Sequence, residues 1–426
     1  MKLNTYLTYQ RALLLIHYIL WPILTLLALI IPAARKRLEF ESQNSSTSFK
    51  NRGIVATHCF HVSSEGELEQ CMSILLNLLE KDHYIELVYT SDSVARRCDQ
   101  LAADYPKLNV LRMPLLSFPR RSFRRWVSAK KFFMCRYDFF SELILYGARA
   151  DVDFTLLSAS LKGKKVSGLK KIFLRGLYRS FNLIVAASER ERESFLRLDK
   201  NLNVISFEFR VLQISSRLEK ARKKFEENKE LAKFLKIVSD RDPLSNLIIG
   251  SAWPVELDIL KDQSIVSRII SGELLLTIAP HSLGEKSVSQ IENLIKEISP
   301  ELRVAIASEV VEYKAGEVYL NTTPGVLLET YSLFGHVLVG GGHGRSIHSV
   351  LEPYLAGARV YCGPRVFRST EFDFIKKESP NDIVIIDDLE RIGSSLVNYE
   401  RELEIAKRRD LILSYRSRFA EMMERI

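Results

Sequence analysis

The sequence predicts an α/β protein in which two Rossmann-like domains face a cleft and an N-terminal helix enters a membrane. Short apolar runs alternate with amphipathic stretches in both halves of the 426-residue chain, which is typical of parallel sheets covered by helices. A densely charged stretch at 215–236 separates the halves. An apolar stretch at 12–34 contains no Asp, Glu, Lys or Arg.

The apolar stretch is long enough to cross a bilayer, because its 23 residues exceed the roughly 20 that span the hydrocarbon core. It lacks the short apolar region and small-residue cleavage site of a signal peptide, so we expect an uncleaved anchor. Tyr18, Trp21 and Pro22 lie within it, which leaves open a helix that is embedded in the membrane without spanning it. The basic residues at 35–37 favour domains that face the cytoplasm.

The first domain is expected at 46–214, after an anchor and linker at 1–45. The polar, serine-rich stretch 39–50 indicates the linker. The alternation predicts strands at 53–60, 84–90, 108–113 and 181–188, and helices at 66–81, 94–105 and 189–198.

The second domain is expected at 245–426, after a charged linker or helix at 215–244. Its predicted strands are 246–250, 273–279, 317–320, 336–339, 358–363 and 382–387, and helices are expected near 255 and from 286, 325 and 347, with further helices after the last two strands. Ligands of such sheets bind outside the carboxyl ends of the strands, so polar residues there are candidates for function.

The composition limits which classes of binding partner are expected. A net charge of +9 and a pI near 9.1 favour anionic partners. The five cysteines are dispersed and form no CxxC pair, which argues against a disulfide framework or a zinc site. Asp151 and Asp153 have the spacing of a metal-binding pair, but they read as a loop, so no metal site is expected.

Polar residues crowd the turn between the first strand and its helix. The turn contains His61, Ser63, Ser64, Gly66 and Glu67. One interpretation is structural, with a serine as the N-cap and Glu67 completing a capping box. The other is functional: Gly66 lets a ligand approach the backbone, and Glu67 acts as a general base in the cleft.

A glycine-rich turn follows the strand at 336–339. The glycines at 340–342 could let backbone N–H groups and the start of the next helix face a phosphate. His348 and Glu352 come next, and a carboxylate there could bind ribose hydroxyls. The spacing fits neither a P-loop nor a dinucleotide-binding fingerprint. The alternative is a structural turn, with Glu352 complementing the helix dipole.

Two further strand ends carry short turns, at 250–254 and at 280–284. Each alone is an ordinary connection between a strand and a helix. Together with the glycine-rich turn, they suggest a nucleotide-sized site in the second domain.

Two segments of the first domain, 112–136 and 162–179, are basic and contain no acidic residue. Phenylalanine and tryptophan are interleaved in the first of them. Such segments beside a membrane anchor suit an interfacial surface that binds an anionic, phosphorylated lipid. A solvated basic face is the alternative, and nucleic-acid binding is not expected because no recognised nucleic-acid-binding module is present.

These motifs resemble those of the Kdo transferases, inverting GT-B glycosyltransferases of lipopolysaccharide synthesis that transfer 3-deoxy-D-manno-octulosonic acid (Kdo). The family pattern His-x-x-Ser-x-Gly-Glu stands here at 61–67. The pattern Gly-Gly-His-Asn-x-Leu-Glu-Pro matches at His348, Leu351, Glu352 and Pro353, with Ser349 in place of Asn and no paired glycine directly before His348. Weaker matches lie at 136–140, 250–254, 280–281 and 321–325.

The resemblance implies transfer of Kdo from CMP-Kdo to a lipid A precursor at the cytoplasmic face of a bacterial inner membrane, without metal or cofactor. It implies that Glu67 is the general base of a single displacement with inversion. The implied donor-binding residues are Ser251, His281, Gly325, Gly340, Gly341, Gly342, His348, Ser349 and Glu352. The expected acceptor-binding residues are His61, Ser64 and Gly66, with Arg120, Arg121, Arg124 and Arg125 from the basic segment.

The departures from the family patterns keep two alternatives open. One is a GT-B transferase that uses another nucleotide sugar and another membrane lipid. The other is a catalytically inactive membrane-bound GT-B scaffold.

Overall fold

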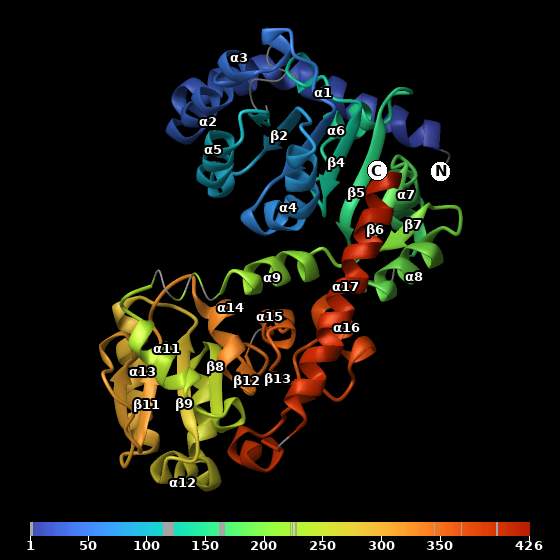
Figure 1. Ribbon diagram of the computed structural model, residues 1–426. Helices are drawn as coiled ribbons and strands as arrows, with labels where there is room; N and C mark the ends of the chain where they lie inside the picture. The colour runs from blue at the N-terminus through green and yellow to red at the C-terminus, as the bar shows by residue number, and fades with distance from the viewer. Residues whose placement is uncertain are drawn as a thin grey trace. The chain divides into compact units, whose positions relative to one another are not determined.

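The computed structural model describes the chain except for residues 1–2, 114–122, 162–166, 222, 224, 226–227, 345, 368 and 398, and except for the side chains of residues 45, 46 and 123. Arg120 and Arg121 therefore lie outside the described residues. The chain divides into two compact units, Met1–Arg210 with Ala420–Ile426, and Val211–Phe419. Each unit has its own sheet covered by helices (Figure 1). The predicted fold class, two Rossmann-like α/β domains in one chain, is confirmed.

The first unit contains a parallel sheet of seven strands in the order β3-β2-β1-β4-β5-β6-β7. The strands are β1 (His58–Val62), β2 (Ile85–Tyr89), β3 (Leu108–Arg112), β4 (Lys131–Cys135), β5 (Asp153–Ala159), β6 (Leu183–Ala186) and β7 (Val204–Ser206). Their nearly continuous apolar runs follow from burial on both faces of a parallel sheet. Aromatic rings join the strands: the Phe154 ring stacks on Phe132 at 5.3 Å and on Phe181 at 4.2 Å.

The helices between the strands of this unit are α4 (Glu65–Glu80), α5 (Ala95–Asp104), α6 (Ser141–Gly147), α7 (Gly168–Tyr178) and α8 (Glu189–Leu198), with short 3-10 turns η2 (Asp92–Val94) and η3 (Phe123–Arg125). The sequence predicted α4, α5 and α8, but it missed α6 and α7 as well as the strands β4, β5 and β7. The helix predicted at 189–198 has the observed bounds, and α4 differs by one residue at each end. The capping serines Ser64 and Ser188 explain why both starts were visible in the sequence.

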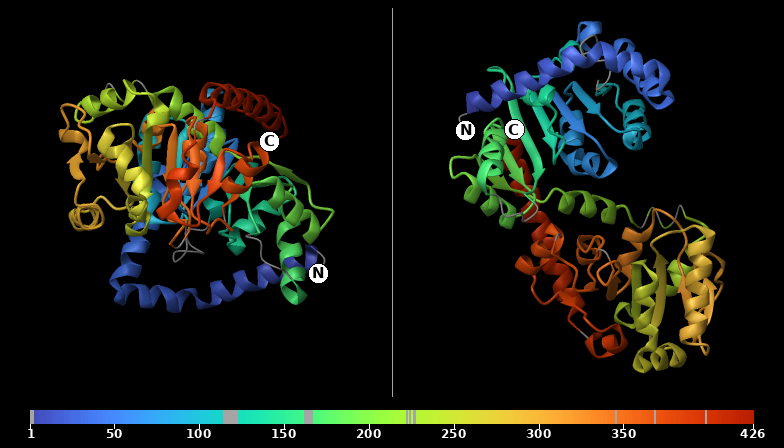
Figure 2. Two further views of the ribbon diagram at one scale, coloured as in Figure 1. Left: turned by 90° about the horizontal axis from the view of Figure 1, so that it is seen from below. Right: turned by 180° about the vertical axis from the view of Figure 1, so that it is seen from behind.

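The N-terminal segment is helical. It forms α1 (Leu3–Ile30), α2 (Pro32–Ser42), α3 (Asn44–Thr47) and η1 (Lys50–Arg52). By length and composition α1 is able to cross a membrane, with a mean hydropathy of 2.4 over its most apolar 18 residues. In Figure 2 it is a long rod beside the first sheet.

The linker predicted at 39–50 is wrong, because this stretch packs along the edge strand β3. Asn44 exchanges two hydrogen bonds with the backbone of Arg112, at 2.7 and 2.6 Å, and Asn109 donates to the Thr47 carbonyl at 2.6 Å. Phe49, which ends the stretch, is buried. Side-chain hydrogen bonds thus satisfy backbone groups along the edge strand β3. These contacts join residues that are distant in sequence, so composition does not reveal them.

The second unit contains another parallel sheet of seven strands, in the order β10-β11-β9-β8-β12-β13-β14. The strands are β8 (Asn246–Ala252), β9 (Leu275–Pro280), β10 (Arg303–Ile306), β11 (Glu317–Leu320), β12 (His336–Val339), β13 (Arg359–Cys362) and β14 (Ile383–Ile385). Its helices are α9 (Arg210–Glu219, which begins at the boundary of the units), α11 (Ala232–Ser239), α12 (Gln263–Ser271), α13 (Glu285–Ile298), α14 (Leu327–Thr330), α15 (Leu351–Leu355), α16 (Thr370–Glu378) and α17 (Arg401–Arg425, which belongs to the first unit from Ala420 on).

Three helix predictions in this unit need correction. A 3-10 helix, η5 (Pro254–Lys261), stands where an α-helix was expected near 255. The helix expected from 325 is the single turn α14, and the one expected from 347 begins only at Leu351. The last difference changes the picture of the glycine-rich turn, because that turn leads into an irregular loop rather than directly into a helix.

Candidate active site

Glu67 lies in the first turn of α4, directly after the carboxyl end of β1. Ser64 is the N-cap of this helix, and its Oγ accepts the N–H of Glu67 at 3.3 Å. In return, Glu67 Oε2 accepts the N–H of Ser63 at 2.7 Å. The capping interpretation of this turn therefore describes a real contact, and that contact fixes the position of the carboxylate.

Burial raises the pKa of Glu67 to about 7. The Ser63 N–H opposes this shift, the Asp138 carboxylate adds to it, and Arg136 opposes it. Asp138 and Arg136 follow β4, which pairs with β1, so the parallel sheet brings all three charged groups to one edge. Sequence analysis did not name Asp138 or Arg136 as site residues, although their place after a strand end was a usable signal.

Two other predicted residues of this turn differ in their surroundings. His61 is buried within β1, its Nε2 lies 2.8 Å from Thr90 Oγ1, and burial lowers its pKa to about 4. It is therefore a neutral residue beneath the turn. A Cβ on Gly66 would meet no atom within 4 Å, and Gly66 is not among the glycines with positive φ. Neither steric crowding nor backbone conformation requires glycine at this position.

Arg124 and Arg125 lie elsewhere in the unit. They are exposed in η3, which leads into the amino end of β4, whereas Glu67 follows the carboxyl end of the neighbouring β1. A five-residue strand is about 16 Å long at roughly 3.3 Å per residue. The sheet therefore separates these two arginines from Glu67.

Four neighbouring strands of the second sheet gather most of the predicted donor-binding residues at one edge. In spatial order β11, β9, β8 and β12, they lead to Gly325, His281, Ser251 and the glycines at 340–342. The sequence predicted these turns separately. Their common position follows from the strand order, which places their carboxyl ends side by side.

The glycines after β12 are required by close packing. A Cβ on Gly340 would collide with the carbonyl of Ser251, and one on Gly342 would collide with the backbone of Gly363. Gly341 has a φ of +89°, in the left-handed region that favours glycine. These residues shape the turn whether or not a ligand is bound.

Several backbone N–H groups that we expected to face a phosphate instead donate hydrogen bonds to carboxylates of the protein. Glu256 accepts the N–H of Gly341 at 3.0 Å. Glu371 accepts the N–H groups of Val350 and Leu351, at 3.0 and 3.2 Å, and so caps α15. A phosphate at this edge must therefore rely mainly on side chains or on other amides of the loop.

Ser349 and Glu352 flank the start of α15. The hydroxyl of Ser349 donates to Glu371 at 3.0 Å, so this residue contributes to the same cap. Glu352 is half-buried and close to Tyr331, whose pKa is raised by burial and further by the charge of Glu352. The Tyr331 hydroxyl reaches Gly250 at the end of β8, so Glu352 lies near the strand edge that gathers the other predicted residues.

Three rings form a stack at the carboxyl ends of β8, β9 and β12. The centroids of Trp253 and His281 are 4.3 Å apart, and those of His281 and His348 are 4.6 Å apart. Trp253 Nε1 donates to His348 Nε2 at 3.1 Å, and because an indole N–H can only donate, Nδ1 carries the proton of the neutral imidazole. Burial, and then the neighbouring His281, lowers the pKa of His348, which favours this neutral form. Trp253 was not named as a site residue from the sequence.

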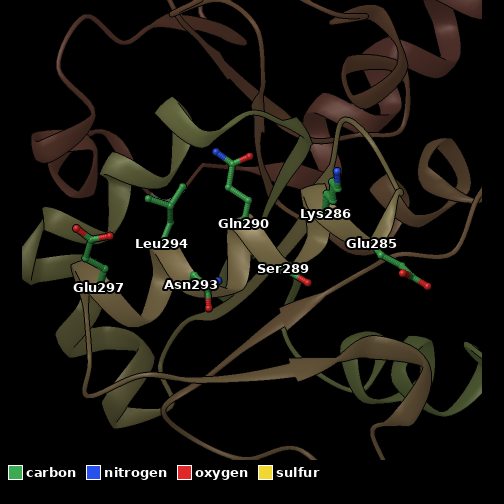
Figure 3. A pocket seen from close by; sticks show the side chains of 7 residues that line it. All are labelled: Glu285, Lys286, Ser289, Gln290, Asn293, Leu294 and Glu297. Carbon is green, nitrogen blue, oxygen red and sulfur yellow. The ribbon is translucent and has the colours of Figure 1, made fainter.

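A hollow of about 620 Å³ lies along α13 (Figure 3). Its lining residues come from successive turns of this helix and are Glu285, Lys286, Ser289, Gln290, Asn293, Leu294 and Glu297. It contains no predicted site residue, and its mixed charges are typical of a solvated helix face. Among the residues that the structure describes, no group of three His, Cys, Asp or Glu side chains is arranged to hold a metal ion.

Comparison with known families identifies the first unit. Residues 33–207 match the family model described as 3-deoxy-D-manno-octulosonic-acid transferase (kdotransferase), N-terminal glycosyltransferase part. This part of the chain belongs to the Kdo transferase family. The resemblance seen in the motifs is thereby confirmed, and the Kdo transferase domain carries Glu67 within the matched range.

A search of curated proteins finds no match. Among solved structures, 42% of the chain is similar to 97% of the C-terminal CMP-Kdo binding domain of WaaA from Acinetobacter baumannii, at 20% identity and a TM-score of 0.35. The UDP-GlcNAc 2-epimerase of Neisseria meningitidis is similar over 85% of this chain and 100% of its own, at 11% identity and a TM-score of 0.49. The α,α-trehalose 6-phosphate synthase of Burkholderia multivorans is similar over 87% and 96%, at 9% identity and a TM-score of 0.46.

Proposed function

We propose that the chain transfers Kdo from CMP-Kdo to a lipid A precursor, with inversion and with Glu67 as the general base. The family of residues 33–207 supports the reaction class. The observation that carries the proposal is the environment of Glu67, a buried carboxyl group with a pKa near 7 beside an unobstructed glycine at a strand end.

A general base must accept a proton from the acceptor hydroxyl as the bond to the sugar forms. A carboxylate with an ordinary pKa is a weak base at neutral pH, and burial strengthens it by destabilising the charged form. The Ser63 N–H holds Oε2, so Oε1 is the oxygen that would face the acceptor. The cap thus orients the carboxylate for this role.

On the donor side, we propose that the ring stack and the residues around it bind the CMP moiety. The Nδ1–H of neutral His348 is a suitable donor to the phosphate that leaves with CMP. The Trp253 side chain, which stacks on His281 and is 37% exposed, is a candidate for stacking on a base. Glu352, near the end of β8, would bind the ribose hydroxyls. Ser251, His281 and Gly325 complete this proposed site, and the glycines at 340–342 give it its shape.

The acceptor proposal rests on the membrane segment. A lipid acceptor is held in a bilayer, so the enzyme must work beside one, and α1 provides a long apolar helix on the Kdo transferase domain. The Gln10 side chain of α1 accepts a hydrogen bond from Ser141 at 2.7 Å, one residue from Phe140, whose ring lies 6.0 Å from that of His61. The membrane segment and the turn that carries Glu67 are therefore close neighbours within this unit.

The test is transfer from freshly generated CMP-Kdo to tetra-acylated lipid A precursor, with wild type and Glu67→Ala compared by mass spectrometry of the lipid. We expect product with wild type and none with the variant, while CMP binding by calorimetry is unchanged. Transfer by the variant at the wild-type rate would retain the substrate assignment and remove Glu67 as base. No product with wild type, beside an active control transferase, would overturn the donor or acceptor assignment.

One observation favours a second candidate, a transferase of the same fold class with another nucleotide sugar. Ser349 stands where the family pattern has Asn, and its hydroxyl is bonded to Glu371. The side chain at this position therefore contributes to the cap of α15. Offering a panel of CMP- and UDP-sugars to the same lipid extract distinguishes the two candidates by the mass that the lipid gains.

A further inference from the structure

The apolar helix α1 is exposed over most of its length. Twelve large hydrophobic side chains between Leu13 and Ile31 are exposed, and Ile30 reaches 78%. The less exposed positions recur every three or four residues, at Leu14, His17, Trp21 and Leu24, which are partly exposed, and at Ala28, which is buried. One stripe of the helix is therefore less exposed than the rest, and the remaining apolar surface would be strongly unfavourable in water.

The start of α1 is fixed to the first unit. Tyr6 is almost fully buried in the core of that unit and packs against Gly176 of α7, where any Cβ would come within 2.7 Å of the Tyr6 side chain. Gln10 is also buried, donates to the Tyr6 hydroxyl at 2.8 Å and accepts from Ser141 of α6 at 2.7 Å.

The chain that follows α1 is fixed to the same unit. Arg37 of α2 donates to the carbonyls of Thr90 and Met113, each at 2.6 Å, and pairs with buried Glu41 at 2.9 Å. Thr90 and Met113 directly follow β2 and β3. Both attachments therefore contact one compact sheet domain, and the exposed apolar part of α1 lies between them.

A spanning helix would separate these two attachments by the thickness of a bilayer. The hydrocarbon core is about 30 Å thick, and a helix of this length measures about 42 Å at 1.5 Å per residue. One domain cannot bind both ends from opposite sides of a membrane. We infer that α1 lies in the plane of one leaflet, on the side of the Kdo transferase domain, and that α7 enters the same leaflet beside it.

The inference that α7 enters the leaflet is based on its own exposed side chains. Leu169 is 85% exposed, and Ile172 and Phe173 are also exposed. The Phe173 ring contacts that of Tyr9 of α1 edge-on at 5.8 Å, so the apolar surfaces of the two helices are continuous. Lys170 and Lys171 lie between these apolar residues, which suits the headgroups of an anionic leaflet.

This topology is tested with single exposed cysteines, because all five native cysteines are buried. Asn4→Cys lies before the apolar part of α1, Lys36→Cys lies after it, and Glu297→Cys on α13 marks the side of the catalytic domains. A membrane-impermeant maleimide is applied to intact spheroplasts and to inverted inner-membrane vesicles that carry the full-length chain. We expect all three positions to be labelled from the same face. Labelling of Asn4→Cys from the face opposite to the other two would establish a spanning helix and overturn the inference.

The position of α7 needs a second measurement. Leu169→Cys carries an environment-sensitive fluorophore on the full chain in liposomes of phosphatidylethanolamine and phosphatidylglycerol, and Val311→Cys, which is 73% exposed in the second unit, is the matched control. Brominated lipids should quench the probe at position 169 and leave that at 311 unchanged. Absence of quenching at 169, or disulfide crosslinking of two copies through that position instead, would remove α7 from the membrane surface. Neither measurement depends on transferase activity, so a failure of the proposed reaction would leave this inference standing.

Discussion

Glu67→Gln separates the two roles that the sequence left open for Glu67. Glutamine keeps an oxygen that can accept the Ser63 N–H, so the cap survives in weakened form, but it cannot accept a proton at neutral pH. General base catalysis contributes about 10²- to 10⁴-fold, which corresponds to about 3–5 kcal/mol of the activation barrier. The cap itself is worth about 0.5–2 kcal/mol of folding stability. The proposal therefore predicts a large loss of kcat with a small loss of stability.

A matched control exists in the same sheet. Glu191 of α8 is also a buried glutamate at the third helical position, behind the capping serine Ser188, and it accepts the N–H of Leu161 at 2.6 Å. Glu191→Gln should lower the free energy of unfolding by a similar amount, while kcat stays within about twofold of wild type. Equal and small losses of kcat in both variants would refute the assignment of Glu67 as base and leave only the cap.

The pH dependence gives a second, independent measure. A base with a pKa of about 7 is about one-tenth ionised at pH 6 and about nine-tenths ionised at pH 8, so kcat/KM should rise about tenfold between these values. The contribution of Glu67 to the free energy of unfolding should change in the opposite direction. Because the pKa of Glu67 in the folded protein lies above its ordinary value of 4.5, this contribution is complete below pH 4.5 and is lost as the pH rises through 7. A flat kcat/KM profile over this range would contradict the ionisation of Glu67 as the controlling step.

Three further predictions follow from the two sites. Asp138→Asn removes a negative charge that raises the pKa of Glu67, so the rising limb of kcat/KM should move to lower pH; an unchanged profile would exclude this coupling. Gly66→Ala should leave the free energy of unfolding within about 0.5 kcal/mol, because a Cβ meets open space, whereas Gly340→Ala should lose at least about 1–3 kcal/mol through its collision with the Ser251 carbonyl, as measured by denaturant titration. His348→Ala should weaken CMP binding by about 1.5–3 kcal/mol, measured by calorimetry, if its Nδ1–H contacts the phosphate; unchanged affinity would place the phosphate elsewhere.

The sequence predicted those parts of the fold that local patterns determine. The bounds of α8 and nearly those of α4 follow from a capping serine and a glutamate three residues later, both within one turn. The strand order cannot be derived in this way, because it depends on contacts between distant segments. The basic residues Arg124 and Arg125 illustrate the consequence: only the pairing of β4 with β1 shows that they lie at the amino ends of the strands, away from Glu67.

The errors have a common physical cause. The stretch 39–50 has the composition of a linker, yet Asn44 bonds to an edge strand more than sixty residues later. The helix expected from 347 begins at Leu351, where Glu371 of another helix supplies the cap. In both cases a polar side chain satisfies backbone groups that are distant in sequence, and no local pattern records that partner.

The capping and catalytic interpretations of Glu67 are compatible, and each supports the other. A carboxylate at a helix N-terminus is stabilised by the dipole and by backbone N–H groups, which alone would lower its pKa. The pKa of Glu67 is instead raised, because burial outweighs the single hydrogen bond from Ser63. Burial alone does not separate the two roles, because Glu191 is a buried capping glutamate as well. The comparison of Glu67→Gln with Glu191→Gln separates them, since only the proposed base should lose kcat strongly.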